Sequence, residues 1–166
     1  MLLLRRVHVR VTHSLQTAKI NNSIFLMPLY QRIVAIDYGT KRIGVAKSDP
    51  LGMFAQPIGT VDRAGLSKLL SPMVEAGEVQ LVVVGYPLNR HGEQTAMTEV
   101  IDRFIESLRL EFPALPIETI NEHCSSKSAM QLLVASGTSR KERKTKGRLD
   151  TAAACLLLSD YLEQQK

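Results

Sequence analysis

Beyond residue 30, the first apolar segments of the chain have the residue spacing of β-strands. Residues 32–36 and 43–47, rich in Val, Ile and Ala, are typical of two strands covered on both faces. Gly39 supplies the turn between them, so the second strand returns antiparallel to the first. Residues 54–61 predict a third strand, in which Pro57 favours an edge position or a bulge. The pattern therefore opens with three antiparallel strands.

The middle of the chain alternates helices with strands. Residues 64–76 carry apolar residues at helical spacing, although Pro72 is expected to kink or shorten this helix. The continuous apolar run 81–84 is typical of a central parallel strand buried on both faces. Residues 93–111 follow the 3.6-residue period closely and predict an amphipathic helix. A fifth strand is expected over residues 116–120.

Two further helices complete the pattern. One is expected from Ser125 or Ser126 through about Ser136, and the last is expected to begin near Asp150, after a basic loop over residues 138–148. The order of elements predicts an α/β fold. We expect a mixed five-stranded sheet, with the antiparallel hairpin strands first, the parallel strands next, and helices on both faces.

The composition is that of an ordinary globular protein, with 45% of the 166 residues hydrophobic and 22% charged. The net charge of +5 is uneven, because residues 1–26 contain four basic residues and no acid, which leaves +1 for the remainder. We therefore divide the chain into a disordered extension or misassigned start, residues 1–29, and a single domain, residues 30–166. Arguments from positive charge must then rest on local clusters.

The same features suggest where the protein resides. Cys124 and Cys155 form no Cys-x-x-Cys pair, which is typical of reduced thiols inside a cell. No apolar run approaches the roughly 20 residues that span a bilayer. We expect a cytoplasmic monomer or homodimer that binds no membrane. Residues 1–26 also have the composition of a transit peptide, so an organelle is the alternative.

Three carboxylates stand where predicted elements begin or end: Asp37, Glu122 and Asp150. Strand ends on one edge of an open α/β sheet line a common crevice. Carboxylates grouped there repel one another unless a hard cation such as Mg2+ or Mn2+ lies between them, and such ions can activate water against a phosphodiester. Singly, each residue also has an ordinary role, as a turn residue, a solvated strand end and a helix cap.

Basic residues are concentrated just before Asp150. Six of the nine residues in 140–148 are basic: Arg140, Lys141, Arg143, Lys144, Lys146 and Arg148. A basic segment beside an acidic site can hold the phosphates of a nucleic acid. A solvated charged loop is the alternative interpretation. We also expect Asn89, in the loop after the fourth strand, to contact nucleic acid at this crevice.

Four motifs together resemble the YqgF/RuvX family, which has an RNase H-like fold. They are residues 36–46, residues 83–89, residues 121–126 with Ala129, and residues 146–150 followed by Ala152, Ala153 and a Leu-rich helix. The resemblance extends from about Arg32 to Leu162.

The resemblance implies a function. It makes Asp37, Glu122 and Asp150 the catalytic and metal-binding carboxylates, with Mg2+ or Mn2+ as the cofactor, and Lys41 and Arg42 a basic turn that binds phosphates. The family is described as nucleases of precursor 16S rRNA. The expected activity is therefore hydrolysis of phosphodiesters at the 5′ end of that RNA during ribosome biogenesis, with the pre-ribosomal particle as partner.

Alternatives remain open. The same chemistry would serve a resolvase of Holliday junctions or other branched DNA. A non-catalytic RNA-binding assembly factor is favoured by Asn121 and His123, which stand where the family usually has Asp and Arg. Residues 37–40 also resemble the phosphate-binding hairpin of actin-like ATPases, but those enzymes need two related lobes, and the chain offers one such hairpin.

Overall fold

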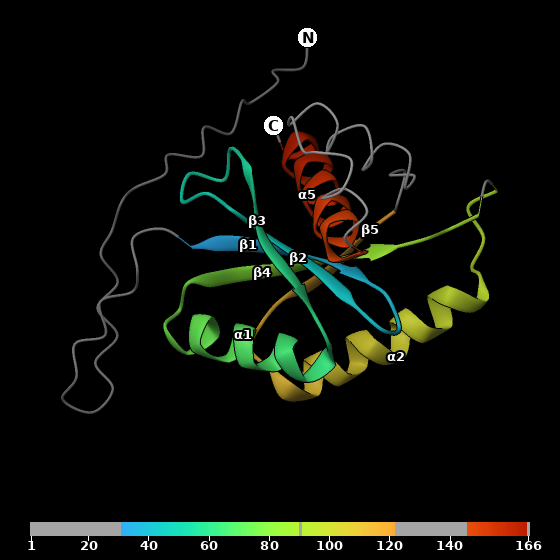
Figure 1. Cartoon of the computed structure of the whole chain (residues 1–166), viewed down its shortest axis with the longest axis horizontal. Helices are drawn as coiled ribbons and strands as arrows, with labels where there is room; N and C mark the ends of the chain where they lie inside the picture. Colours follow the sequence, from blue (N-terminus) through green and yellow to red (C-terminus); the bar gives the residue numbers. More distant parts are fainter. Residues whose placement is uncertain (1–30, 90, 122–145, 166) are drawn as a thin grey trace, which may run out of the picture.

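The computed structural model describes residues 31–89, 91–121 and 146–165, and its centre is one five-stranded sheet (Figure 1). The strands are β1 (Arg32–Tyr38), β2 (Ile43–Ser48), β3 (Ala55–Val61), β4 (Val79–Tyr86) and β5 (Ile117–Asn121). Their order across the sheet is β3-β2-β1-β4-β5. β1 and β3 are antiparallel to β2, whereas β4 is parallel to both β1 and β5. The predicted mixed sheet is confirmed.

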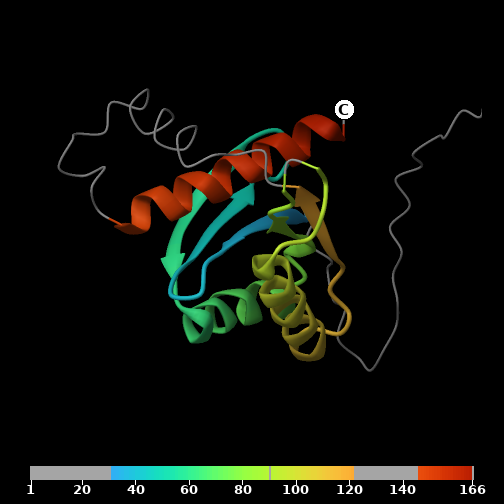
Figure 2. The same cartoon turned by 90° about the vertical axis from the view of Figure 1, so that its right-hand side faces the viewer.

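Helices cover both faces of the sheet, as predicted (Figure 2). α1 (Arg63–Glu75) and α2 (Ala96–Glu111) lie on one face, and α5 (Lys146–Gln164) lies on the other. None of the helices in these described ranges is long and apolar enough to cross a bilayer. β3 is an edge strand, and its pairing with β2 shifts register next to Pro57, so the expectation of an edge or a bulge at this proline is confirmed.

α1 confirms the helix predicted over residues 64–76 to within one residue at each end, and Pro72 does not shorten it. Two other predicted helix starts need correction. α2 begins at Ala96, because Thr95 caps it: the Thr95 hydroxyl accepts from the Thr98 amide, and the Thr98 hydroxyl accepts from the Thr95 amide. α5 begins at Lys146, about one turn before the predicted start. The helix predicted around residues 125–136 lies outside the described residues.

The core has two parts, one on each face of the sheet. Under α1 and α2 it contains mainly large aliphatic residues, such as Val34, Ile36, Ile43, Val45, Leu66, Leu70, Val82, Val84, Ile101 and Leu108. Under α5 it contains Ile33, Ala35, Ala46, Val83, Ile120, Ala154, Leu157, Leu158, Tyr161 and Leu162. Successive residues of β1 and β2 therefore point alternately into the two cores. This alternation decides which face the candidate site occupies.

Candidate functional site

Asp37 lies on the face of the sheet that α5 covers. Ile36 belongs to the core under α1 and α2, and Ala35 belongs to the core under α5. Side chains alternate along a strand, so Asp37 shares the face of Ala35. It is half-buried, and the register of the hairpin pairs it with Gly44 on β2. Asp37 is thus the next-to-last residue of β1 and not, as predicted, the first residue after the strand.

Gly44 is the point where α5 comes closest to the sheet. A Cβ atom placed on Gly44 would lie 2.0 Å from the carbonyl oxygen of Asp150 and 3.1 Å from the amide nitrogen of Thr151. Any side chain would push the helix away, so only glycine permits this backbone approach. Because Gly44 is also the register partner of Asp37, the contact brings Asp150 to Asp37.

Thr60 on β3 fixes the first turn of α5. Its hydroxyl is hydrogen-bonded to the carbonyl oxygen of Gly147, and its Oγ1 lies 2.8 Å from Oγ1 of Thr151. The Thr151 hydroxyl in turn donates to the Gly147 carbonyl at 3.0 Å. A Cβ atom on Gly147 would meet Cβ of Thr60 at 3.3 Å, so the helix and the edge strand are closely packed here. These bonds fix the helix one turn before Asp150.

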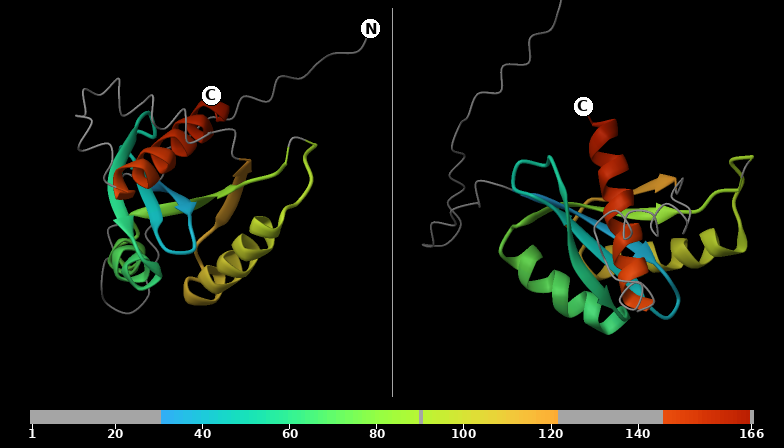
Figure 3. Two further views of the ribbon diagram at one scale, coloured as in Figure 1. Left: turned by 45° about the vertical axis from the view of Figure 1, so that its right-hand side comes forward. Right: turned by 45° about the horizontal axis from the view of Figure 1, so that its top comes forward.

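Arg42 links the first hairpin to Asp150. Its Nε donates to Oδ2 of Asp150 at 2.6 Å, and the two side chains are 43% and 22% exposed. A pair this exposed contributes at most about 1 kcal/mol to stability, so its main effect is to orient the carboxylate. Lys41, the preceding residue, is exposed. Figure 3 (right) shows the first turn of α5 beside the turn that joins β1 to β2.

Two of the three predicted carboxylates therefore come together. Asp37 and Asp150 share one face at the carboxyl end of β1, whereas Glu122 lies outside the described residues, directly after Asn121 at the end of β5. Within the described ranges, no group of three or more His, Cys, Asp or Glu could hold a metal ion. A site with three carboxylates remains a prediction. Asp150 lies in the second turn of α5, which excludes the role of helix cap.

Of the residues predicted to contact nucleic acid, some are described by the structure and others lie outside the described ranges. Lys41 and Arg42 lie in the hairpin turn, and Arg148 is exposed in the first turn of α5. Lys146 begins α5, but its side chain is not among the described ones. Four predicted basic residues lie outside the described residues: Arg140, Lys141, Arg143 and Lys144.

Asn89 has a structural role in the loop between β4 and α2. Its side-chain oxygen accepts from the amides of His91 at 2.8 Å and Glu93 at 2.9 Å, and its side-chain nitrogen donates to Oε2 of Glu93 at 2.9 Å. The side chain folds the loop around itself, so contact of its amide group with nucleic acid stays a prediction. The sequence carried a signal for this turn, because Asn followed three residues later by Gly favours one.

Sequence reasoning missed Gly44 and Thr60. A glycine in the middle of an apolar strand indicates close approach of another backbone, so Gly44 could have been singled out. Thr60 carried no such signal, since a threonine in an edge strand is ordinary.

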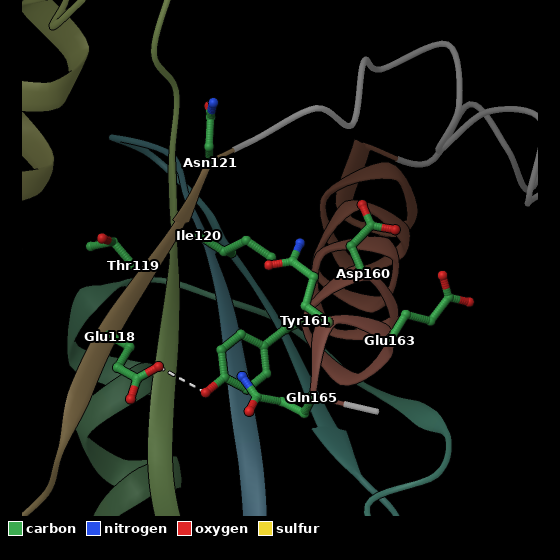
Figure 4. A pocket seen from close by; sticks show the side chains of 9 residues that line it. Glu118, Thr119, Ile120, Asn121, Asp160, Tyr161, Glu163 and Gln165 are labelled. Carbon is green, nitrogen blue, oxygen red and sulfur yellow. Dashed lines mark hydrogen bonds between the residues drawn. The ribbon is translucent and has the colours of Figure 1, made fainter. Parts of the chain in front are cut away.

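A separate pocket lies between β5 and the last turns of α5 (Figure 4). Its volume is about 610 Å3, and its lining includes the carboxylates of Glu118, Asp160 and Glu163. The Tyr161 hydroxyl donates to Oε2 of Glu118 at 2.8 Å, the dashed line in Figure 4. Burial, and then the hydrogen bond to Glu118, raise the pKa of Tyr161 to about 12. Its surplus of carboxylates makes this pocket unsuited to phosphates.

Comparison with known proteins identifies relatives of this chain. The family model RuvX, described as Holliday junction resolvase, matches residues 31–164. A protein of Chlorobaculum tepidum named "Putative pre-16S rRNA nuclease" is 59% identical over 134 residues, which are 81% of this chain and 94% of that protein. A protein of Salinibacter ruber with the same name is 37% identical, covering 80% of this chain and 93% of that protein. Among solved structures, Thermus thermophilus RuvC matches with a TM-score of 0.49 at 9% identity, over 81% of this chain and 96% of that one.

Proposed function

Since the chain belongs to the RuvX family, we propose that it is a cytoplasmic, metal-dependent nuclease that processes the 5′ end of precursor 16S rRNA within the pre-ribosomal particle. The observation that carries the proposal is the close approach of α5 to the first hairpin at Gly44. Gly44 is the register partner of Asp37 and lies against the Asp150 backbone, which supports a shared site for residues 113 positions apart in the sequence. The substrate in this proposal, precursor 16S rRNA, is taken from the names of the relatives.

The donor chemistry fits a hard divalent cation. Asp37 and Asp150 offer carboxylate oxygens, the ligands that Mg2+ and Mn2+ prefer, and Glu122 would supply a third. An ion held by these residues would stabilise negative charge on the phosphate and favour ionisation of water. Without a cation, carboxylates gathered at one site would repel one another.

The neighbouring cations have a distinct role. Arg42 holds the Asp150 carboxylate in one orientation through Nε. Lys41 and Arg148 are exposed, and their positive charges would attract phosphates of the RNA. In this proposal Lys41 and Arg148 bind and align the substrate strand. Arg42 orients Asp150, and the carboxylates act at the scissile bond.

The test is cleavage of a labelled RNA that contains the precursor 16S 5′ end, with Mg2+, Mn2+ or EDTA. We expect metal-dependent cleavage by the wild type and at least a 100-fold loss in Asp37→Asn and Asp150→Asn, as for removal of a group that acts on the transition state. The matched control is Asp160→Asn, which changes a carboxylate on the same helix that lines the separate pocket beside β5. This variant should cleave the RNA at the wild-type rate. Cleavage by Asp37→Asn at the wild-type rate would refute the assignment of Asp37.

A second candidate, resolution of branched DNA, is favoured by the description of the family model as Holliday junction resolvase. A four-way DNA junction added to the same reaction separates the two. If the junction is cut faster than the RNA, resolution of branched DNA replaces rRNA processing as the proposed function. Binding of RNA without cleavage of either substrate would indicate an assembly factor instead.

A further inference from the structure

The loop between β4 and α2, residues 87–89 and 91–95, starts at the same edge of the sheet as Asp37. β4 runs parallel to β1 with Val84 beside Ile36, so the end of β4 at Tyr86 is level with the end of β1. His91 is exposed on this loop. A nucleic-acid strand lying over the candidate site would pass this loop on the side of β4.

The loop is a preformed unit. Asn89 accepts and donates hydrogen bonds inside it, its backbone amide donates to the Glu93 carbonyl at 3.0 Å, and the Thr95 hydroxyl donates to the carbonyl of Pro87 at 3.4 Å. The described residues of the loop are therefore held mainly by hydrogen bonds to one another.

Tyr86 provides such an attachment. Its hydroxyl donates to the Asp102 carboxylate on α2, at 3.0 and 3.1 Å to the two oxygens, and accepts from the Gln94 side chain at 3.3 Å. Gln94 belongs to the loop and Asp102 belongs to the helix. One phenol oxygen therefore connects the strand end, the loop and the second turn of α2, and its ring packs against the core under α1 and α2.

We propose that Tyr86 is a positioning residue for substrate binding: through Asp102 and Gln94 it holds the loop, residues 87–89 and 91–95, where the loop contacts the nucleic-acid strand. This rests on the nuclease function proposed above. Tyr86 packs against the core under α1 and α2, whereas Asp37 lies on the face of the sheet under α5. Loss of the network is therefore expected to weaken binding of the strand and to leave the chemical step intact.

The test is Tyr86→Phe, which keeps the ring and removes the hydroxyl. We expect KM for the precursor RNA, and Kd for the same RNA with Ca2+ in place of Mg2+, to rise about tenfold, with kcat within twofold of the wild type. Asp102→Ala should raise KM as much as Tyr86→Phe, and the double variant should raise it no further. Asp102→Asn, which keeps an oxygen that can accept from the phenol, should restore most of the affinity.

Tyr161→Phe is the matched control. It removes a phenol–carboxylate bond of similar length, to Glu118, in the pocket at the other end of α5. A purely structural role for Tyr86 predicts that both variants lose similar stability and that neither changes KM. Unchanged KM and Kd in Tyr86→Phe overturn the proposal while cleavage by the wild type stands. A wild type that binds RNA without cutting it overturns the nuclease function instead, and the Kd comparison still decides the role of Tyr86; a wild type that binds no RNA overturns both.

Discussion

The two faces of the β1–β2 hairpin are built from side chains of different size. Toward α1 and α2 the hairpin presents Val34, Ile36, Ile43 and Val45, all at most 1% exposed. Toward α5 it presents Ala35, Gly44 and Ala46 next to the candidate site, and Ile33 lies at the far end of β1. Large residues fill the space under a helix, whereas small residues let the helix backbone approach the strand. One face therefore contributes mostly to stability, and the other sets the distance between functional groups.

This difference separates folding from function in one short hairpin. On the large-residue face, lost volume weakens the core but moves no predicted site residue. On the small-residue face, added volume displaces Asp150, because the atom that it meets is backbone. Substitutions on the two faces should therefore differ in kind, and the predictions below run from the largest effect to the smallest.

Gly44→Ala should have the largest effect. The new methyl group would overlap the Asp150 carbonyl, so α5 must shift. A displacement of about 1 Å at the proposed catalytic carboxylate can cost 100-fold in rate. We expect at least a 100-fold fall in kcat/KM for RNA cleavage, in a protein whose circular dichroism still shows a folded state. Wild-type cleavage by this variant would contradict the role assigned to Gly44.

Leu70→Ala tests the other face. Leu70 is fully buried in the core under α1 and α2, so its truncation should lower the free energy of unfolding by about 3 kcal/mol. Urea denaturation followed by circular dichroism is the measurement, since the chain has no Trp. At temperatures where both proteins are folded, cleavage should stay within twofold of the wild type. A loss of cleavage as large as that expected for Gly44→Ala would contradict the proposed difference between the two faces of the hairpin.

Thr60→Val should have a smaller effect on both properties. It keeps the shape of the side chain but removes the hydroxyl bonded to Gly147 and Thr151, which costs about 1 kcal/mol. With the first turn of α5 less firmly held, cleavage should fall about fivefold. Thr119→Val, at an exposed position on the other edge strand, is the matched control. Equal effects of the two substitutions would show that Thr60 does not act through α5.

The smallest effect should appear only at high pH. The pKa of Tyr161 is raised to about 12 in the folded protein from an ordinary value of 10, so the unfolded chain loses its proton first. The stabilisation is complete below pH 10 and is lost as the pH rises toward 12. Relative to Tyr161→Phe, the wild type should lose on the order of 1 kcal/mol of unfolding free energy across this window. A difference between the two proteins that stays constant to pH 12 would contradict this account.

Much of the fold follows from local patterns in the sequence. The five strands and the helix α2 were predicted within a few residues, because apolar spacing reports directly which side of an element is buried. The start of α5 was missed for the same reason. Its first turn, Lys146–Arg148, is polar and is fixed by Gly44 and Thr60, so no apolar period marks it.

The candidate site was only partly predictable. Asp37 and Asp150 could be selected as carboxylates, but the reason given for Asp150, a helix N-terminus, was wrong. The ion pair with Arg42 and the bond from Tyr86 to Asp102 depend on three-dimensional packing and leave no periodic signal in the sequence. Asn89 was selected for a contact with nucleic acid, which stays a prediction, and its role in organising its own loop was not predicted.

The contact of the first hairpin with α5 also bears on protein synthesis. Arg42 and Asp150 are 108 residues apart, so a nascent chain that has emerged as far as β5 carries Asp37 but has no helix to place beside it. Contacts of such large sequence separation form late in folding. The candidate site is therefore completed only when α5 has formed against the first hairpin.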